Sequence, residues 1–144
     1  MITSHVYDTG TYIVNLMVSD AADNTDSDTL TVTVTEANTM HIADIDMSTT
    51  IIKLNGWYTY ATATVTIVDA DGDSVAGANV SGTWSGLTGD TDSDVTDIYG
   101  QVALDSDPVK NAAGTFTFTV DDVVLSGLTY DPTANVETSK SITV

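Results

Sequence analysis

Two runs of alternating aspartates are the part of this sequence whose residue types and spacing could do chemistry. The first run is Asp69, Asp71 and Asp73, and the second is Asp90, Asp92 and Asp94, followed by Asp97. Alternate residues of a loop can aim their carboxylates at one point, which suits the oxygen ligands that calcium prefers. Neither run has both the sixth-position glycine and the terminal glutamate of an EF-hand loop. Each run therefore predicts either a calcium site of another kind or a solvated acidic turn.

The plain-turn alternative needs no ion. Gly72 can adopt positive φ, and aspartate side chains accept hydrogen bonds from turn amides. Asp44 and Asp46 offer a different possibility, because carboxylates from adjoining modules could share a cation and stiffen the joint between them. Two carboxylates are too few ligands by themselves. Calcium is thus the one cofactor that the sequence leaves open.

Tyr58 and Tyr60 form a second candidate site. Both lie opposite Trp57 in an alternating segment, so the tyrosines are exposed if Trp57 belongs to the core. An exposed pair could bind a sugar ring or a partner protein, or it could only flank a polar sheet face or touch the preceding hairpin. Asn79 begins the triplet Asn-Val-Ser, an acceptor pattern for N-glycosylation that also arises often by chance.

Catalytic patterns are poorly supported. The two histidines, His5 and His41, lack a metal-binding spacing such as His-Glu-x-x-His. The sequence contains neither a Gly-x-Ser-x-Gly elbow nor a phosphate-binding glycine loop. Aspartate pairs are numerous, but nothing marks one pair as a buried catalytic dyad. We expect a protein that is not an enzyme.

The acidic composition narrows the possible partners. The 144 residues include 21 acidic residues, 3 lysines and no arginine, and the formal net charge is -18. Because phosphate binding requires clustered lysine and arginine, nucleic acids and anionic membrane surfaces are excluded as partners. The absence of cysteine excludes disulfides and thiolate metal sites. No apolar run approaches the roughly 20 residues that span a bilayer and no leader follows Met1, so we expect no membrane insertion in this segment and any secretion signal upstream.

Alternation with a period of two predicts β-strands along nearly the whole chain. Thr11–Ser19 and a second strand from Thr29 to Thr35 flank an acidic stretch from Asp20 to Asp28, which predicts a hairpin with an exposed loop. Residues 36–40 predict a linker. Later strands are predicted within 57–67, 78–85, 102–104, 116–120, 128–130 and 142–144. Many short strands without helical periodicity predict an antiparallel β-sandwich, with Trp84 in its core.

The first of these segments resembles the last third of a PKD domain. The resemblance covers residues 5–36 and depends on the pattern His5-x-Tyr7-x-x-Gly10-x-Tyr12-x-Val14-x-Leu16-x-Val18-x-Asp20. Gly10-x-Tyr12 is similar to the tyrosine corner of immunoglobulin-like folds. The earlier strands of that family do not precede this pattern here, and a two-stranded hairpin is marginal in water. The resemblance therefore implies a hairpin that is disordered, packs on the second module, or pairs with another copy.

The remainder, about residues 40–144, is similar to the bacterial and archaeal Ig-like domains of surface adhesins of the invasin and intimin type. The resemblance depends on Thr64-Val-Thr-Ile-Val-Asp-Ala-Asp-Gly-Asp-Ser-Val-Ala-Gly-Ala-Asn-Val80, Gly82-Thr-Trp84 and Thr96-Asp-Ile-Tyr-Gly-Gln-Val102. Turn signals and alternating apolar residues recur in many sandwiches, so the specificity is moderate. The resemblance implies a stackable extracellular segment.

Together these features predict an all-β chain: a truncated PKD-like hairpin at residues 1–36 and an immunoglobulin-like antiparallel β-sandwich at 37–144. We expect a non-catalytic module of a cell-surface or secreted protein that acts in spacing, adhesion or protein-protein assembly beside neighbouring modules of its parent chain. The alternatives are an accessory carbohydrate- or protein-binding module of an extracellular hydrolase, and a calcium-stiffened linker. An aromatic cluster exposed over a concavity would favour the binding module, whereas polar threonine faces would favour the spacer.

Overall fold

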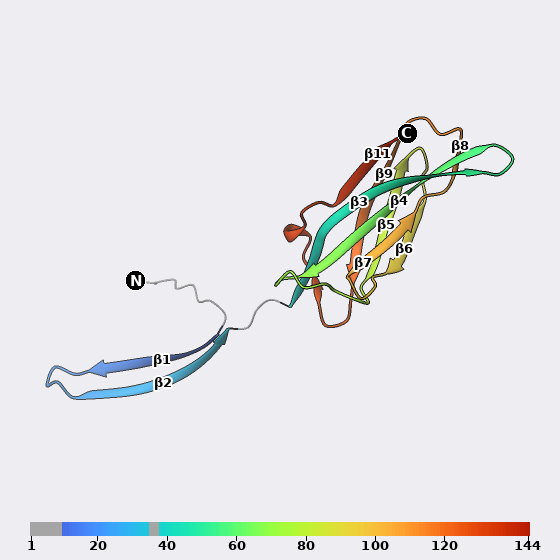
Figure 1. Ribbon diagram of the computed structural model, residues 1–144. Helices are drawn as coiled ribbons and strands as arrows, with labels where there is room; N and C mark the ends of the chain where they lie inside the picture. Colours follow the sequence, from blue (N-terminus) through green and yellow to red (C-terminus); the bar gives the residue numbers. More distant parts are fainter. Residues whose placement is uncertain (1–9, 35–37) are drawn as a thin grey trace. The chain divides into compact units, whose positions relative to one another are not determined.

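The chain folds almost entirely into β-strands, which confirms the predicted all-β class. The computed structural model describes residues 10–34 and 38–144, and the chain divides into two compact units, Met1–Ala37 (unit 1) and Asn38–Val144 (unit 2) (Figure 1). His5 and Tyr7 lie outside the described residues, as do Glu36 and Ala37 of the predicted linker. Within the described ranges, no helix is long and apolar enough to cross a membrane.

Unit 1 is an antiparallel hairpin of β1 (Gly10–Ser19) and β2 (Thr25–Val34). Gly10 pairs with Val34 and Ser19 with Thr25, so even-numbered residues share one face of the hairpin. That face, the apolar face of unit 1, comprises Tyr12, Val14, Leu16, Val18, Leu30, Val32 and Val34, with Asp26 and Asp28 near the turn. The predicted hairpin is confirmed, but the predicted loop from Asp20 to Asp28 is wrong. The turn already closes at Asn24, and the ladder includes Asp26 and Asp28.

Unit 2 is a sandwich of two sheets, with strand orders β10-β3-β4-β7 and β11-β9-β5-β6 and with β8 also paired to β4. The strands are β3 (Thr39–Lys53), β4 (Trp57–Asp69), β5 (Asn79–Gly86), β6 (Thr91–Val95), β7 (Gln101–Asp105), β8 (Val109–Lys110), β9 (Thr115–Val124), β10 (Thr129–Tyr130) and β11 (Ser139–Thr143). A 3-10 turn, η1 (Pro132–Ala134), precedes β11. The pairing is antiparallel except between β10 and β3. The predicted immunoglobulin-like sandwich is confirmed (Figure 1).

The core lies between the two sheets and follows the predicted alternation. On the first sheet β4 contributes a strip of small and medium side chains, namely Ala61, Ala63, Val65 and Ile67. The second sheet contributes Val80 and the large rings of Trp84, Phe116 and Phe118. Trp84 is fully buried, as predicted, and its ring centroid lies 4.8 Å from that of Phe118. Burying a valine, isoleucine or phenylalanine side chain contributes about 1.5–3 kcal/mol, so this core is the main source of stability.

β3 is the longest strand that the sequence pattern does not reveal. Its core-facing residues are Met40 and Ile42 before a bulge, and Ile45 after it, because the register with β4 shifts between Ile42 and Asp44. A bulge inserts one extra residue, so the apolar positions change from even to odd numbers. The alternation of apolar and polar residues is thereby broken in the sequence. Only the pairing with β4 shows that Thr39–Lys53 is one continuous strand.

Exposure of Tyr58 and Tyr60 was predicted only if Trp57 belongs to the core, and Trp57 does not. It lies on the core side of β4, as its alternation with Tyr58 and Tyr60 predicts, but 56% of its surface is exposed. β3 and β4 extend over 15 and 13 residues, whereas the strands of the facing sheet have at most 10. The β3–β4 hairpin therefore continues past the cover of the other sheet, and Trp57 sits in that uncovered part rather than in the core.

β5 and β9 approach each other closely at Gly82. A Cβ on Gly82 would lie 2.6 Å from the Thr119 carbonyl oxygen and would also meet the Phe118 ring. Overpacking of this kind costs about 1–3 kcal/mol, so we expect Gly82→Ala to lower the free energy of unfolding by about 2 kcal/mol in urea titrations. Gly89→Ala is the matched control, because nothing lies within 4 Å of its added carbon. Equal stability of the two variants would contradict this account of the core.

Candidate functional site

The first aspartate run forms the turn between β4 and β5. One oxygen of Asp69 accepts hydrogen bonds from the backbone N–H groups of Asp71 at 3.0 Å and Asp73 at 2.9 Å. The N–H of Asp69 donates to the Asp73 carbonyl at 2.9 Å, and Gly72, with a φ of 86°, donates to the Asp69 carbonyl at 3.1 Å. The Asp69 carboxylate thus stabilises the loop by binding the loop's own amides.

The same five-residue turn occurs three times, at Asp20–Asn24, Asp69–Asp73 and Asp97–Gln101. In each, the first aspartate accepts hydrogen bonds of 2.8–3.0 Å from the amides of the third and fifth residues. The fourth residue has positive φ, and is Asp23, Gly72 or Gly100. This is the three-residue hairpin loop with a left-handed last position. In the first copy, hydrogen bonds from the Asn24 side chain and then from the Asn24 and Ala22 amides hold the pKa of Asp20 below its usual value.

The second aspartate run does not form a loop, and the expectation of a solvated loop there is wrong. Asp90 precedes β6 and accepts hydrogen bonds from the Thr88 hydroxyl of its own loop at 2.8 Å and from the Asp107 amide at 3.1 Å, the second of which ties the segment after β7 to it. Asp92 and Asp94 lie within β6 itself, where they pair with Gly82 and Val80 of β5. The three carboxylates therefore have separate structural surroundings.

Asp92 and Asp94 cap the open edge of their sheet. The Trp84 amide donates to the Asp90 carbonyl, and the Thr96 amide donates to the Ala78 carbonyl. The backbone N–H and C=O groups of even-numbered residues in β6 therefore point toward β5. The amides of Ser93 and Val95 therefore point away from β5, and they donate at 2.8 Å to the Asp92 and Asp94 carboxylates respectively. Each aspartate thus satisfies the outward amide of the next residue, an arrangement that we call an edge cap.

Edge caps recur on other strands. Asp26 and Asp28 accept from the amides of Ser27 and Thr29 on β2, Asp46 accepts from Met47 on β3, and Asp122 accepts from Val123 on β9. Unpaired amides on a sheet edge are a template for another strand, and negative charge at the edge opposes such pairing. Many of the aspartates in this acidic chain are therefore explained by the backbone amides that they bind.

The described residues contain no group of three or more histidine, aspartate or glutamate side chains arranged to hold a metal ion. Near Asp44 and Asp46 the positive charge comes from Lys140, whose ammonium lies 2.9–3.0 Å from both Glu137 oxygens. Glu137 raises the pKa of Lys140, with smaller contributions from Asp44 and Asp46. The Lys140 hydrogen bonds, followed by the one from the Ile45 amide at 2.8 Å, lower the pKa of Glu137. The positive charge near Asp44 and Asp46 is thus the ammonium group of Lys140.

Tyr58 and Tyr60 lie on the outer face of β4, as predicted, and both are half-buried. The Tyr58 hydroxyl donates to the Asn55 side chain at 3.1 Å, and the Lys110 ammonium lies 5.9 Å from the Tyr58 ring centroid. On the opposite face of the same hairpin, the Lys53 ammonium lies 5.2 Å from the Trp57 ring centroid. Two of the three lysines thus meet aromatic rings within one small region, which the sequence analysis missed because Lys110 is far from Tyr58 along the chain.

Asn79 is exposed on β5, between Val95 of β6 and Val124 of β9. Its side chain lies on the outward side of the strand, as the alternation predicts. Glycosylation of Asn79 therefore stays a prediction, and its side chain is accessible.

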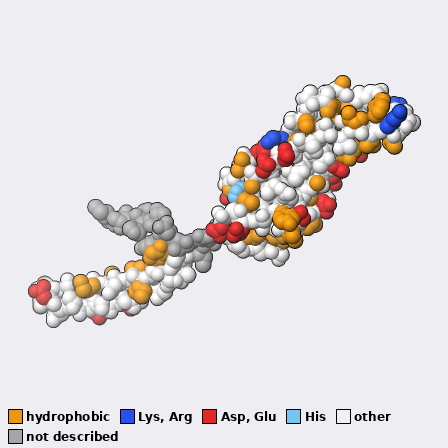
Figure 2. Space-filling view, in the orientation of Figure 1, with side chains coloured by type: hydrophobic (Ala, Val, Ile, Leu, Met, Phe, Trp, Pro, Cys, Tyr) orange, Lys and Arg blue, Asp and Glu red, His pale blue; other side chains and the backbone are white. Residues whose placement is uncertain are grey.

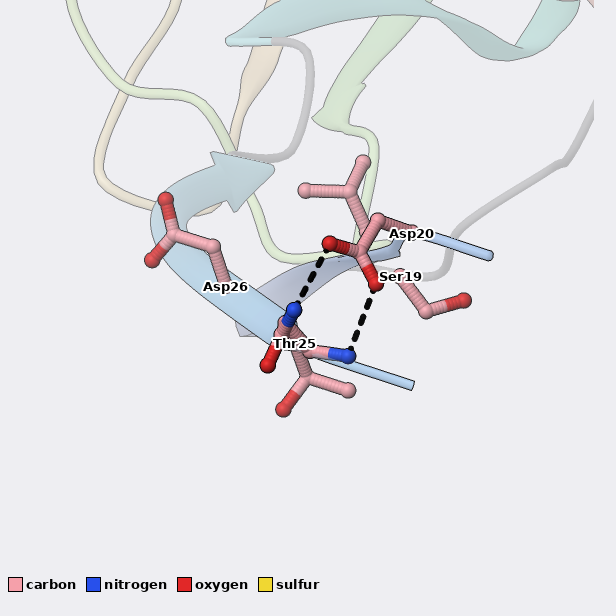
Figure 3. Close-up of a pocket in the computed structure, with 6 residues that line it drawn as sticks. Ser19, Asp20, Thr25 and Asp26 are labelled. Carbon is pink, nitrogen blue, oxygen red and sulfur yellow. Dashed lines mark hydrogen bonds between the residues drawn. The ribbon is translucent and has the colours of Figure 1, made fainter. Parts of the chain in front are cut away.

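Open pockets lie along the apolar face of unit 1. One of about 350 Å³ is lined by Val18, Ser19, Asp20, Asn24, Thr25 and Asp26. Figure 3 shows that Asp20 turns toward the start of β2, where its two carboxylate oxygens accept hydrogen bonds from the Asn24 amide at 3.0 Å and side chain at 2.8 Å. A second, of about 460 Å³, is lined by Val14, Leu16, Asp28, Thr29 and Leu30. The apolar side chains of Val14, Leu16 and Leu30 in this second pocket suit contact with another surface rather than chemistry on a small substrate.

Comparisons of the chain with protein-family models, with curated proteins and with solved structures found no match. Three features of the structure bear on function: carboxylates that bind backbone amides, an exposed apolar face on unit 1, and lysines beside aromatic rings on unit 2.

Asp69 should be important for stability, and Asp71 should not. Asp69→Ala removes two charge-assisted hydrogen bonds in the turn, so we expect the free energy of unfolding to fall by about 1–2 kcal/mol in urea titrations. Asp71→Ala, at the exposed position of the same turn, is the control and should change stability by less than about 0.5 kcal/mol. If instead calcium raises the melting temperature and Asp71→Ala abolishes that rise, the run is an ion site.

Removing the edge caps of β6 should promote association through this edge. We expect the double variant Asp92→Thr, Asp94→Thr to form dimers or larger species at concentrations where the parent chain does not, because two outward amides lose both their acceptor and the nearby charge. Light scattering after size-exclusion chromatography measures this. The variant Asp92→Asn, Asp94→Asn keeps an acceptor and removes the charge, so it should fall between the two. Unchanged mass for the threonine variant would contradict the protective role.

Proposed function

We propose that this chain is a non-catalytic module of a cell-surface or secreted protein, in which it contributes spacing and protein-protein assembly. The observation that carries the proposal is the uncovered apolar face of unit 1. Unit 2 serves as the spacer and unit 1 as the element that pairs with other β-structure.

The packing of unit 2 supports a spacing role. Its two sheets enclose a continuous apolar core that includes residues of β3, β4, β5, β7 and β9. The outer side of β9 and β11 carries a ladder of hydroxyl pairs, in which Thr115, Thr117 and Thr119 meet Thr143, Ser141 and Ser139 at 2.8–3.1 Å. A polar threonine face of this kind is what distinguishes a spacer from a module with an aromatic binding platform. The Lys110 ammonium also lies near the Tyr58 ring, which weakens the case for a sugar platform there.

The exposed surface of unit 1 supports an assembly role. Leu16 is 64% exposed and Leu30 is 63% exposed, and Val14 and Val18 are exposed beside them. A two-stranded hairpin with one apolar face is marginal in water, and it becomes stable when further strands or a second sheet cover that face. The resemblance of residues 5–36 to a PKD domain makes neighbouring modules of the same parent the natural cover, and it also motivates the extracellular location.

The two edges of the hairpin differ in a way that supports the same role. The β2 edge carries the caps of Asp26 and Asp28, whereas β1 has no charged residue from Gly10 to Ser19. Charge at an edge opposes strand addition, so β1 is the edge at which another strand meets the least repulsion.

Substitution of the apolar face tests the proposal. We expect the parent chain to self-associate with rising concentration in sedimentation velocity runs, because an exposed apolar face of this kind favours contact with another copy. Leu16→Asp should remove the contribution of unit 1 and so weaken this association. Met17→Asp is the matched control, since Met17 is 70% exposed on the opposite face, and it should leave the association unchanged. A parent chain that stays monomeric over the whole concentration range would contradict an assembly role for unit 1.

A further inference from the structure

Unit 2 presents two exposed clusters of apolar side chains whose neighbouring charges have opposite sign. The first, which we call the basic tip, comprises Ile51, Lys53, Leu54, Trp57, Tyr58 and Lys110. The second, the acidic end, comprises Asp69, Asp71, Asp73, Asp97, Ile98 and Tyr99. β4 begins at Trp57 and ends at Asp69, and its 13 residues separate the two clusters by about 40 Å at the usual rise of a strand.

The basic tip is anomalous in a chain with a net charge of -18. It holds two of the three lysines, and segments 47–58 and 108–114 contain no acidic residue. The ion pair found within the described residues joins Lys140 to Glu137, so Lys53 and Lys110 meet aromatic rings there instead of carboxylates. Figure 2 shows lysine side chains beside hydrophobic ones at the far end of the β3–β4 hairpin. A carboxylate-bearing partner would find complementary charge at this tip.

The exposed apolar residues of the tip indicate a protein partner. Leu54 is 69% exposed and Ile51 is 64% exposed, in the same β3–β4 hairpin as the exposed Trp57. Aliphatic side chains exposed together with an aromatic ring are typical of a contact with another protein surface, since they release water on burial but form no hydrogen bonds with a sugar.

The acidic end carries the complementary features. The turn Asp97–Gln101 presents Ile98, 77% exposed, and Tyr99, 67% exposed, as two adjacent apolar side chains. The neighbouring turn Asp69–Asp73 carries the exposed carboxylates of Asp71 and Asp73. The two turns lie together, because the Ile67 amide donates a hydrogen bond to the Gly100 carbonyl at 2.8 Å.

We propose that the basic tip of unit 2 docks onto the acidic end of unit 2 in a second copy of this chain. The apolar side chains of the two clusters bury one another, and Lys53 and Lys110 face the carboxylates of Asp71 and Asp73. Because the two surfaces differ, the contact is head-to-tail and can repeat into a linear assembly. The Debye length of about 8 Å at physiological salt screens the repulsion between the remaining charges while leaving the contact pairs effective. This proposal names a second assembly surface, independent of the apolar face of unit 1.

Charge reversal in the full-length Leu16→Asp background tests the proposal, because that substitution removes association through unit 1. Variant A carries Lys53→Glu and Lys110→Glu, and variant B carries Asp71→Lys and Asp73→Lys. Each alone should be monomeric in sedimentation velocity runs, whereas an equimolar mixture should associate, since the acidic tip of A matches the basic end of B. A Leu16→Asp background chain that is monomeric at all concentrations overturns the proposal, as does a mixture that fails to associate.

An apolar substitution provides an independent readout. Leu54→Ser should weaken association of the Leu16→Asp background by about tenfold, as for a central interface residue. Val136→Ser is the matched control, because Val136 is 74% exposed outside both clusters, and it should have no effect. Equal effects of the two would overturn the assignment of the tip. A third outcome separates the two proposals. If the parent chain associates, Leu16→Asp abolishes that association and Leu54→Ser does not change it, then the proposed function remains and this second surface is excluded.

Discussion

The packing of large rings from one sheet against small side chains of the other is the constraint on which unit 2 depends. Trp84, Phe116 and Phe118 are fully buried on β5 and β9, and the facing strand β4 presents Ala61 and Ala63 at its centre. Protein interiors are close-packed, so this volume must be divided unequally between the two sheets. Gly82 serves the same requirement, because its missing side chain leaves room for the Phe118 ring.

The second requirement is that backbone amides at sheet edges find acceptors. In this chain aspartate meets it repeatedly, both in the three matching turns and in the edge caps of β2, β3, β6 and β9. A carboxylate is suited to both tasks, since it accepts charge-assisted hydrogen bonds and repels an approaching acidic strand. Many of the aspartates that make the protein acidic therefore accept hydrogen bonds from its backbone amides. The exceptions are informative: β1 lacks charge, and the end of the β3–β4 hairpin carries lysine.

Particular residues show how far local pattern carries. The alternation around Val80, Trp84, Phe116 and Phe118 predicted buried strand faces correctly. β3 was missed because the bulge after Ile42 reverses which positions face the core, and that reversal is defined only by pairing with β4. β6 was taken for a loop because alternating aspartate and polar residues have low strand propensity, and its neighbour β5 overrides that preference. Whether Trp57 belongs to the core could not be predicted, because alternation does not say where the covering sheet ends.

The sequence by itself determined the all-β class, the hairpin of unit 1 and the faces of most strands, because each depends on residues a few positions apart. The tertiary structure decided which amides lie at a sheet edge, and hence that Asp92 and Asp94 act as caps while Asp69 closes a turn. It also decided that Lys110 meets Tyr58 and that Trp57 is uncovered. The physical reason is the same in each case. Whether a backbone or side-chain group is paired, covered or exposed depends on neighbours brought together from distant parts of the chain, and local periodicity contains no information about them.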